Sequence, residues 1–270
     1  MALRRAAHQV FDEPKVLDDP LALRIVGGAA GEVRAGKARH QSPRGKHFRA
    51  FLVARSRYAE DQLAASVGRG VDQYVVLGAG LDTSAYRGVA ASGIRVFEVD
   101  HPNTQAWKIK CLEVAGIAVP SSVCFVTVDF ERQNLGTQLK EAGLRADRAT
   151  FFSWLGVVPY LTRDAAGQTF GFIGSFPEGS GVAFDYAVSP ASLRLVERMA
   201  LAALSARVAM AGEPFRLFFR PEELDGFLKE LGFRRVEQLG SQKINETYFA
   251  ARSDGLEVAG AAGRIVSAWV

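Results

Sequence analysis

The amino-acid sequence predicts an α/β protein built on a doubly wound, mostly parallel sheet. The first observation is composition, because 270 residues that are 48% hydrophobic and 23% charged suffice for one large globular domain. The second is a rhythm in which short apolar runs alternate with segments of helical periodicity. The third is that the apolar runs show little polar alternation, which is typical of parallel strands buried on both faces.

The first part of the chain, residues 1–70, is expected to form a helical cap. A short helix is predicted after Asp19 and Pro20, with Gly27 and Gly28 at its end. A longer helix is predicted from about residue 45 to residue 68, because apolar side chains recur there at helical spacing.

The central part, residues 71–188, is expected to carry the parallel sheet and the ligand site. Apolar runs predict five strands, over 73–78, 92–100, 122–130, 149–157 and 179–187. The segments between them predict helices over 102–115, 133–142 and 162–173, the last with Thr162 as N-cap.

The last part, residues 189–270, has a different pattern. A helix is predicted from about Pro190 to Met210, and a shorter one begins at Pro221 and ends at Gly232. Two β-like runs, 233–240 and 246–253, follow without a full helix between them, and we expect an antiparallel C-terminal hairpin there. No internal repeat or linker is visible, so residues 1–270 are expected to form a single domain.

Composition also excludes several classes of partner. The net charge of +4 is too small to indicate nucleic acid, and the basic run between Arg34 and Arg57 is interpreted mainly as a solvated helix face. Two cysteines exclude a disulfide scaffold, and His8, His40 and His47 lack metal-ligand spacing. Neither a signal peptide nor an apolar run of about 20 residues is visible, so we expect a cytoplasmic protein without membrane contact.

Two glycines follow the first predicted strand directly. Gly78 and Gly80 flank Ala79, and a Gly-x-Gly turn lets the backbone turn tightly and approach a ligand. The dinucleotide fingerprint requires a third glycine where this chain has Thr83, so a bound pyrophosphate is disfavoured. Taken alone, the pattern is equally compatible with a plain tight turn.

Acidic residues close the next two predicted strands. Asp100 stands 20 residues beyond Gly80, where an acid can accept hydrogen bonds from both ribose hydroxyls. Asp129 and Phe130 close the third strand, where a carboxylate and a ring can recognise an exocyclic amine and the adenine beside it. Each residue alone could be an ordinary strand-end residue, whereas the three strand ends together predict a nucleoside-shaped pocket.

The sequence resembles a known family through six motifs that occur in a fixed order. They are Leu17-Asp18-Asp19-Pro20-Leu21-Ala22, Ala54-Arg55-Ser56-Arg57, Leu77-Gly78-Ala79-Gly80-Leu81-Asp82-Thr83 with Tyr86-Arg87, Phe97-Glu98-Val99-Asp100-His101-Pro102, Val128-Asp129-Phe130 and Gly156-Val157-Val158-Pro159-Tyr160-Leu161. Together, over roughly residues 16–250, they resemble the leucine carboxyl methyltransferase-like family, in its bacterial polyketide O-methyltransferase branch. The resemblance implies a class I methyltransferase (Rossmann-like) fold and S-adenosyl-L-methionine (SAM) as methyl donor.

The resemblance also implies a set of cofactor-binding residues. Arg55 matches the arginine that holds the methionine carboxylate, and Gly78 and Gly80 match the turn under the methionine part. Asp100 matches the ribose acid, and Asp129 with Phe130 the adenine site. The full predicted set is Arg55, Gly78, Ala79, Gly80, Asp82, Asp100, Asp129, Phe130 and Leu155. Leu155 departs from the family, because many members carry a glutamate there that meets the ammonium of the donor.

Catalytic residues are harder to predict. His101 is a histidine next to the predicted ribose acid and could act as a base, although a turn histidine fixed by Pro102 is the favoured interpretation. Tyr160 could equally line the substrate cleft or belong to the core. We therefore expect a SAM-dependent O-methyltransferase that acts on a carboxylate or hydroxyl of a small molecule, such as a polyketide-like metabolite. The alternatives are an NAD-dependent oxidoreductase and a catalytically silent nucleotide-binding regulatory module.

Overall fold

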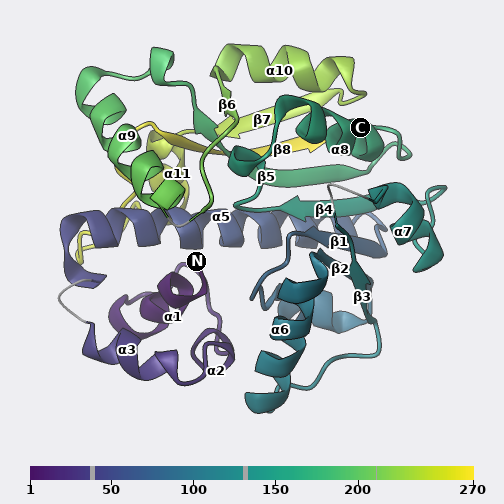
Figure 1. The fold of residues 1–270 in the computed structure, drawn as a ribbon, viewed down its shortest axis with the longest axis horizontal. Helices are drawn as coiled ribbons and strands as arrows, with labels where there is room; N and C mark the ends of the chain where they lie inside the picture. Colours follow the sequence, from purple (N-terminus) through teal and green to yellow (C-terminus); the bar gives the residue numbers. More distant parts are fainter. Residues whose placement is uncertain (37–39, 130–132, 211) are drawn as a thin grey trace.

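A computed structural model describes residues 1–36, 40–129, 133–210 and 212–270. An eight-stranded sheet in the order β3-β2-β1-β4-β5-β8-β7 runs through the described residues, and β6 pairs with β5 outside this path (Figure 1). The strands are β1 (Gln73–Leu77), β2 (Arg95–Asp100), β3 (Val123–Thr127), β4 (Thr150–Trp154), β5 (Gly181–Val188), β6 (Phe218–Phe219), β7 (Arg235–Leu239) and β8 (Gly263–Trp269).

The predicted parallel core is confirmed. β1 lies between β2 and β4, both of which are parallel to it, and the parallel order continues to β3 on one side and to β5 on the other. Helices α6 (Pro102–Val114), α7 (Leu135–Glu141) and α8 (Arg163–Gly174) connect these strands close to their predicted positions. Thr162 caps α8 as predicted, because its hydroxyl accepts a hydrogen bond from the Ala165 N–H at 3.2 Å.

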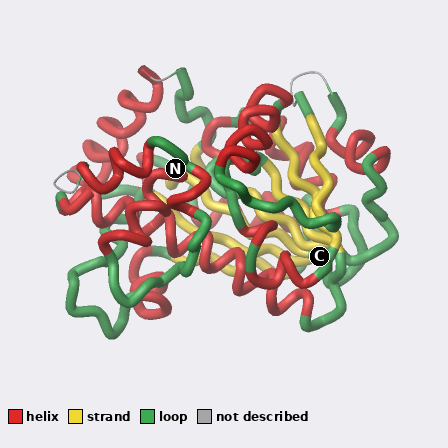
Figure 2. Tube along the Cα trace, turned by 90° about the horizontal axis from the view of Figure 1, so that it is seen from below, coloured by secondary structure: helices red, strands yellow, loops and turns green. Residues whose placement is uncertain are grey.

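Helices cover both faces of the sheet (Figure 2). One face packs against the long helix α5 (Pro43–Val67), where Val53, Ala54 and Tyr58 join a core with Phe151 and Ala183. The opposite face packs against α7, α8 and α10 (Pro221–Glu230) in a second core. The main side chains of that second core are Leu135, Leu139, Phe152, Trp154, Phe170, Ile173, Phe184, Leu224 and Leu228.

Helix α5 begins slightly earlier than the sequence predicted. Ser42 is its N-cap and accepts a hydrogen bond from the Gly45 N–H, while Pro43 occupies the first turn, where a missing N–H costs nothing. The helix ends at Val67, with the predicted end residue Gly68 as its C-cap. Its 25 residues cross the whole molecule in Figure 1 and lie between the sheet and the N-terminal helices α1 (Ala2–Phe11), α2 (Ala22–Ile25) and α3 (Ala29–Ala35).

The predicted hairpin of residues 233–240 and 246–253 is wrong in its second strand. Residues 241–248 form helix α11 (Ser241–Tyr248), in which Ile244 and Tyr248 stand one turn apart and contact the core under α5. The antiparallel partner of β7 is instead β8, at the end of the chain, which is inserted between β5 and β7. Ile265 to Trp269 are buried, so β8 is a central strand rather than an edge.

Two other boundaries differ from the prediction or go beyond it. Helix α9 (Leu195–Met210) begins five residues after Pro190, because Pro190 starts a separate 3₁₀ turn and Leu193 is extended. Helix α1 was not predicted, and its Ala6 and Ala7 form a small core with Ala22 and Val33.

The division into a cap over 1–70, a core over 71–188 and a C-terminal part over 189–270 stays a prediction. Within the described residues, no helix is long and apolar enough to cross a membrane.

Candidate functional site

The glycine turn after β1 and the acid at the end of β2 lie in direct contact. Gly78 and Gly80 have φ angles of +66° and +47°, a conformation that side chains with a Cβ rarely adopt. The Asp100 carboxylate then accepts a hydrogen bond from the Gly80 N–H at 2.6 Å. The structure therefore brings these predicted residues together at the carboxyl ends of two neighbouring strands, where ligands bind in doubly wound sheets.

Asp129 lies at the next strand end. The Val128 N–H donates to the Asp100 carbonyl at 2.9 Å, which keeps the chain after β3 beside β2 up to the residue before Asp129. The Asp129 N–H donates to the side chain of Gln133 at 2.9 Å. Phe130, the predicted aromatic partner of Asp129, lies outside the described residues.

Arg55 reaches from α5 to Asp185 inside β5 and to the loop after β4. Its Nη1 donates to Asp185 Oδ2 at 2.7 Å, and both side chains are about 95% buried. The other oxygen of Asp185 accepts from the Gly156 N–H at 2.6 Å, so one carboxylate ties Arg55 to the loop after β4. A Cβ on Gly156 would stand 2.8 Å from the Arg55 guanidinium, and the glycine makes this approach possible. Arg55 Nε is buried without a hydrogen-bond partner among the described residues.

Sequence reasoning missed Asp185, because it lies within a fully buried strand rather than at the end of one. Leu155, the predicted departure from the family, follows β4 and is half-buried against the core under α5. The registry pairs Trp154 with Phe184, so Leu155 stands level with Asp185 on the neighbouring strand.

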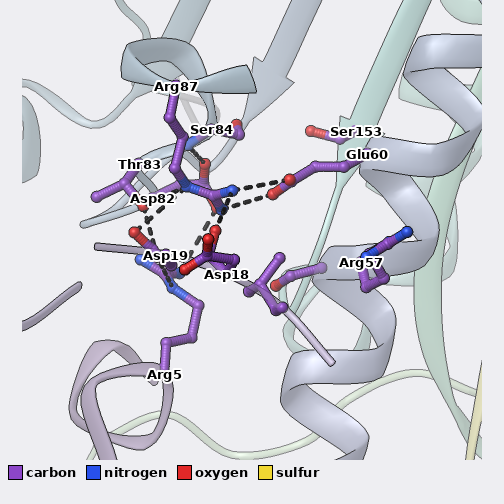
Figure 3. A network of polar contacts seen from close by, with 12 residues as sticks. Arg5, Asp18, Asp19, Arg57, Glu60, Asp82, Thr83, Ser84, Arg87 and Ser153 are labelled. Carbon is purple, nitrogen blue, oxygen red and sulfur yellow. Dashed lines mark hydrogen bonds and ion pairs between the residues drawn. The ribbon is translucent and has the colours of Figure 1, made fainter. Parts of the chain in front are cut away.

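A network of charged residues surrounds Asp82 and Thr83, which follow the glycine turn in the sequence (Figure 3). At its centre is Asp19, fully buried, which accepts a hydrogen bond from the Thr83 hydroxyl at 2.7 Å. Arg5 from α1 lies 3.4 Å from one oxygen of Asp19, and Arg87 lies 3.3 Å from the other. Arg87 also binds Glu60 of α5 through two hydrogen bonds, at 2.6 and 2.8 Å. Residues of two sequence motifs thus form one ionic cluster. Thr83, which replaces the third glycine of the dinucleotide fingerprint, has a structural role in this cluster as a hydrogen-bond donor to Asp19.

Asp82 belongs to the same network. Its carboxylate accepts a hydrogen bond from the Ser84 N–H at 2.7 Å and lies 3.5 Å from Arg5 Nη1. Burial opposes ionisation of this carboxyl, but Arg5, Lys108 and the hydrogen bonds from Ser84 hold the pKa of Asp82 down at about 2. Asp82 is therefore ionised and anchors the turn, and its predicted contact with the cofactor stays a prediction.

The two weak catalytic candidates occupy different surroundings. His101 is the N-cap of α6, and its Nδ1 accepts a hydrogen bond from the Asn103 N–H at 3.3 Å, which supports the turn-histidine interpretation. Tyr160 lies in a 3₁₀ turn after β4 and its ring stands 5.2 Å from the ring of Phe215. Burial raises the pKa of the Tyr160 hydroxyl, so this group is a poor source of a phenolate base.

The basic run is less exposed than predicted. Arg49 is fully buried and binds both oxygens of Asp12, at 2.6 and 2.7 Å, which corrects the solvated-face interpretation at this position. Arg57 pairs with Asp61 on the surface of α5. Lys37 and Arg39 lie outside the described residues. No group of three or more histidine, cysteine or acidic side chains capable of holding a metal occurs in the described part of the chain.

Comparisons with known proteins agree with this geometry. The "Leucine carboxyl methyltransferase" family model matches residues 1–174. The chain is 35% identical to "Putative S-adenosyl-L-methionine-dependent methyltransferase YktD" of Bacillus subtilis over 211 residues, which are 76% of this chain and 67% of that protein. It is 31% identical to a similarly named protein of Mycobacteroides abscessus, over 74% of this chain and 66% of the relative. The alignments thus span about two thirds of the relatives' own length.

Two solved structures share the fold. A DUF574 family protein from Streptomyces avermitilis aligns with a TM-score of 0.58 and 19% identity, over 92% of this chain and 95% of that protein. A "putative methyltransferase" from Thermobifida fusca aligns with a TM-score of 0.57 and 15% identity, over 91% of both chains. The predicted class I fold and the predicted donor are thereby confirmed, and nothing in these comparisons supports an NAD-dependent oxidoreductase. The chain belongs to the leucine carboxyl methyltransferase family of SAM-dependent methyltransferases.

Proposed function

We propose that this protein is an O-methyltransferase that transfers the methyl group of SAM to a carboxylate of a small, largely apolar molecule. The main support for a SAM site is the hydrogen bond from the Gly80 N–H to Asp100, because it places the strand-end acid directly at the glycine turn. The family description names a carboxyl acceptor, which favours a carboxylate over other oxygen nucleophiles.

The residues at the strand ends fit the shape and charges of SAM. A Cβ on Gly80 would meet no heavy atom within 4 Å, so the turn faces open space that a ligand can fill. In the proposed assignment Gly78, Ala79 and Gly80 support the methionine part, Asp100 accepts from the ribose hydroxyls and Asp129 accepts from the adenine amine. Arg55 faces the methionine carboxylate, and its unpartnered Nε provides a donor there.

The chemistry needs little beyond positioning. The bound donor supplies an activated methyl group on a sulfonium, and the protein aligns the acceptor oxygen with it and excludes water. A carboxylate is ionised at neutral pH and needs no base, whereas a phenol with a pKa of about 10 needs one. The two candidate bases fit this chemistry poorly, because Tyr160 holds its proton tightly and His101 caps a helix, which favours a carboxylate acceptor.

The acceptor side is proposed to lie beside Tyr160. Its ring packs on Phe215, and Phe215 in turn packs on Phe218 with the rings 6.2 Å apart. The backbone around Pro159 also holds this segment, since the N–H groups of Arg216 and Leu217 donate to the Pro159 carbonyl. Such an aromatic wall suits the apolar body of a polyketide-like acid.

Calorimetric titration tests the donor site. S-adenosylhomocysteine is expected to bind the wild-type protein, NAD is not, and Asp100→Ala is expected to weaken S-adenosylhomocysteine binding by about 1–3 kcal/mol because a charge-assisted hydrogen bond is lost. Failure of S-adenosylhomocysteine to bind at millimolar concentration would refute the donor site and favour a catalytically silent module.

A second experiment tests the acceptor. The protein is incubated with methyl-labelled SAM and matched panels of apolar carboxylic acids and phenols. Alkali releases labelled methanol from a methyl ester but not from a phenyl methyl ether. Label that stays bound after alkali would overturn the carboxylate proposal while leaving the donor site intact.

A further inference from the structure

We propose that Asp185 binds the ammonium group of SAM, so that Arg55 and Asp185 together form a two-charge site for the amino-acid end of the donor. This inference rests on the proposed function. It concerns a residue that the sequence motifs do not include, and it assigns an acceptor for the ammonium in a chain that has Leu155 where the family resemblance implies a glutamate.

The registry places Asp185 beside the position of the missing acid. Trp154 of β4 pairs with Phe184 of β5, and the next residues along these parallel strands are Leu155 and Asp185. Neighbouring strands lie about 4.8 Å apart. Phe151 and Ala183, which share the parity of Leu155 and Asp185, belong to the core under α5, and Leu155 packs against that core. Asp185 therefore provides a carboxylate one strand away from residue 155, on the same face.

The contacts of Asp185 leave it capable of accepting further hydrogen bonds. Its two oxygens accept from Arg55 Nη1 at 2.7 Å and from the Gly156 N–H at 2.6 Å. A carboxylate has about four lone-pair sites, so an ammonium can still donate to it. These two donors also fix the orientation of the carboxylate, which lowers the entropic cost of ordering it when the ligand binds.

The charge pattern matches a zwitterion. Arg55 and Asp185 are adjacent opposite charges, and the amino-acid end of SAM carries a carboxylate and an ammonium on one carbon atom. In this arrangement the ligand carboxylate faces Arg55, whose Nε lacks a partner among the described residues, and the ammonium faces Asp185. A glutamate at residue 155 would bring a second carboxylate beside Asp185, and two adjacent carboxylates repel. Leu155 is thus the residue expected when the acid stands on β5.

The role of Asp185 can be tested with two ligands that differ only in the ammonium group. S-adenosylhomocysteine carries both charges, and its deamino analogue, with a carboxypropyl chain on sulfur, keeps the carboxylate but lacks the ammonium. The wild-type protein is expected to bind S-adenosylhomocysteine at least tenfold more tightly than the deamino analogue, as measured by calorimetry. Equal affinities would overturn the inference without any variant, and failure of both ligands to bind would instead count against the proposed function.

Asp185→Asn then identifies the residue responsible. It is expected to weaken S-adenosylhomocysteine at least tenfold, equivalent to about 1.4 kcal/mol, and to change the affinity for the deamino analogue less than threefold. Equal weakening of both ligands would mean that Asp185 only orients Arg55, and the inference would be wrong. Asp225→Asn is the matched control, since Asp225 accepts a hydrogen bond from Gln238 away from the strand ends.

If Asp185→Asn destabilises the fold, a variant with the carboxylate moved to residue 155 still tests the proposal. The double variant Leu155→Glu with Asp185→Asn moves the acid to the adjacent strand and keeps one negative charge beside Arg55. It is expected to restore the preference for S-adenosylhomocysteine over the deamino analogue to within threefold of wild type. Leu155→Glu alone is expected to lower the melting temperature, because it places two carboxylates side by side. A folded double variant that binds both ligands equally would contradict the proposal.

Discussion

Alanine substitution of the two glycines in the turn after β1 should give different losses of stability. Both have positive φ, and this conformation costs an alanine roughly 1–2 kcal/mol. At Gly80 the new Cβ would meet nothing within 4 Å, so the backbone strain is the whole cost. At Gly78 the Cβ would stand 2.4 Å from Cγ2 of Val157, far inside van der Waals contact, and overpacking adds roughly 1–3 kcal/mol.

The expected loss is therefore roughly 1–2 kcal/mol for Gly80→Ala and roughly 2–5 kcal/mol for Gly78→Ala. Urea denaturation of the two variants and of wild type measures the difference, and thermal melts should show shifts of roughly 2–4 °C per kcal/mol for a chain near this size. Both experiments use the protein without ligand, so they test the turn rather than the donor site.

Val157→Ala provides the control, because it removes the methyl group that the Gly78→Ala side chain would meet. In the Gly78→Ala background this change should recover part of the lost stability, giving a favourable coupling energy of about 1–3 kcal/mol in a double-mutant cycle. In the Gly80→Ala background the two changes should add. Additive effects at Gly78, or equal losses at the two glycines, would refute the reasoning.

Three further predictions concern the buried charges. Asp12→Ala should destabilise the fold by about 3–5 kcal/mol in urea denaturation, because fully buried Arg49 loses both of its hydrogen bonds to that carboxylate; a loss below 1 kcal/mol would contradict this. The folded-state pKa of Asp82 is depressed to about 2 from 3.8. Its ionised form therefore adds about 2 kcal/mol to the free energy of unfolding above pH 4, and this stabilisation is lost as the pH falls toward 2. Asp82→Asn should flatten the stability profile in that window, and an unchanged slope would argue against an ionised Asp82. Thr83→Val should lower the free energy of unfolding by about 1–3 kcal/mol, because Asp19 loses a hydrogen-bond donor in a fully buried site. Calorimetric melting measures this loss, and an unchanged melting temperature would contradict the prediction.

The parallel core could be predicted because its strands are mostly apolar and lack a regular polar alternation. All five residues of β1 and of β4 are buried, and such runs separated by helical periodicity leave few alternatives to a doubly wound sheet. The C-terminal part was harder to predict. Residues 246–253 have a β-like composition because of Tyr248 and Phe249, but these two rings pack against the core from the end of helix α11 and the turn after it. The partner of β7 lies 24 residues farther along the chain than the end of that strand, and only tertiary packing selects it.

The ionic clusters illustrate a second limit. Sequence patterns treat arginines as surface residues, because buried charges are rare unless paired. Arg5, Arg49 and Arg87 are nevertheless largely buried, since partners from distant segments surround them. The motifs at Asp19 and Thr83 were recognised as features of a family, but their direct contact across 64 residues could not be deduced from either motif alone.

The donor site shows how a local departure in sequence can be compensated in space. Leu155 leaves the ammonium without the glutamate that the family resemblance implies at this position, and the sequence motifs offer no other acid beside it. Asp185 follows 30 residues later, inside a strand whose apolar pattern hides it. Only the registry of β4 and β5, together with the reach of Arg55 from α5, shows that its carboxylate stands beside residue 155. In the proposed site the ammonium needs one negative charge next to Arg55, and adjacent parallel strands offer two positions from which to supply it.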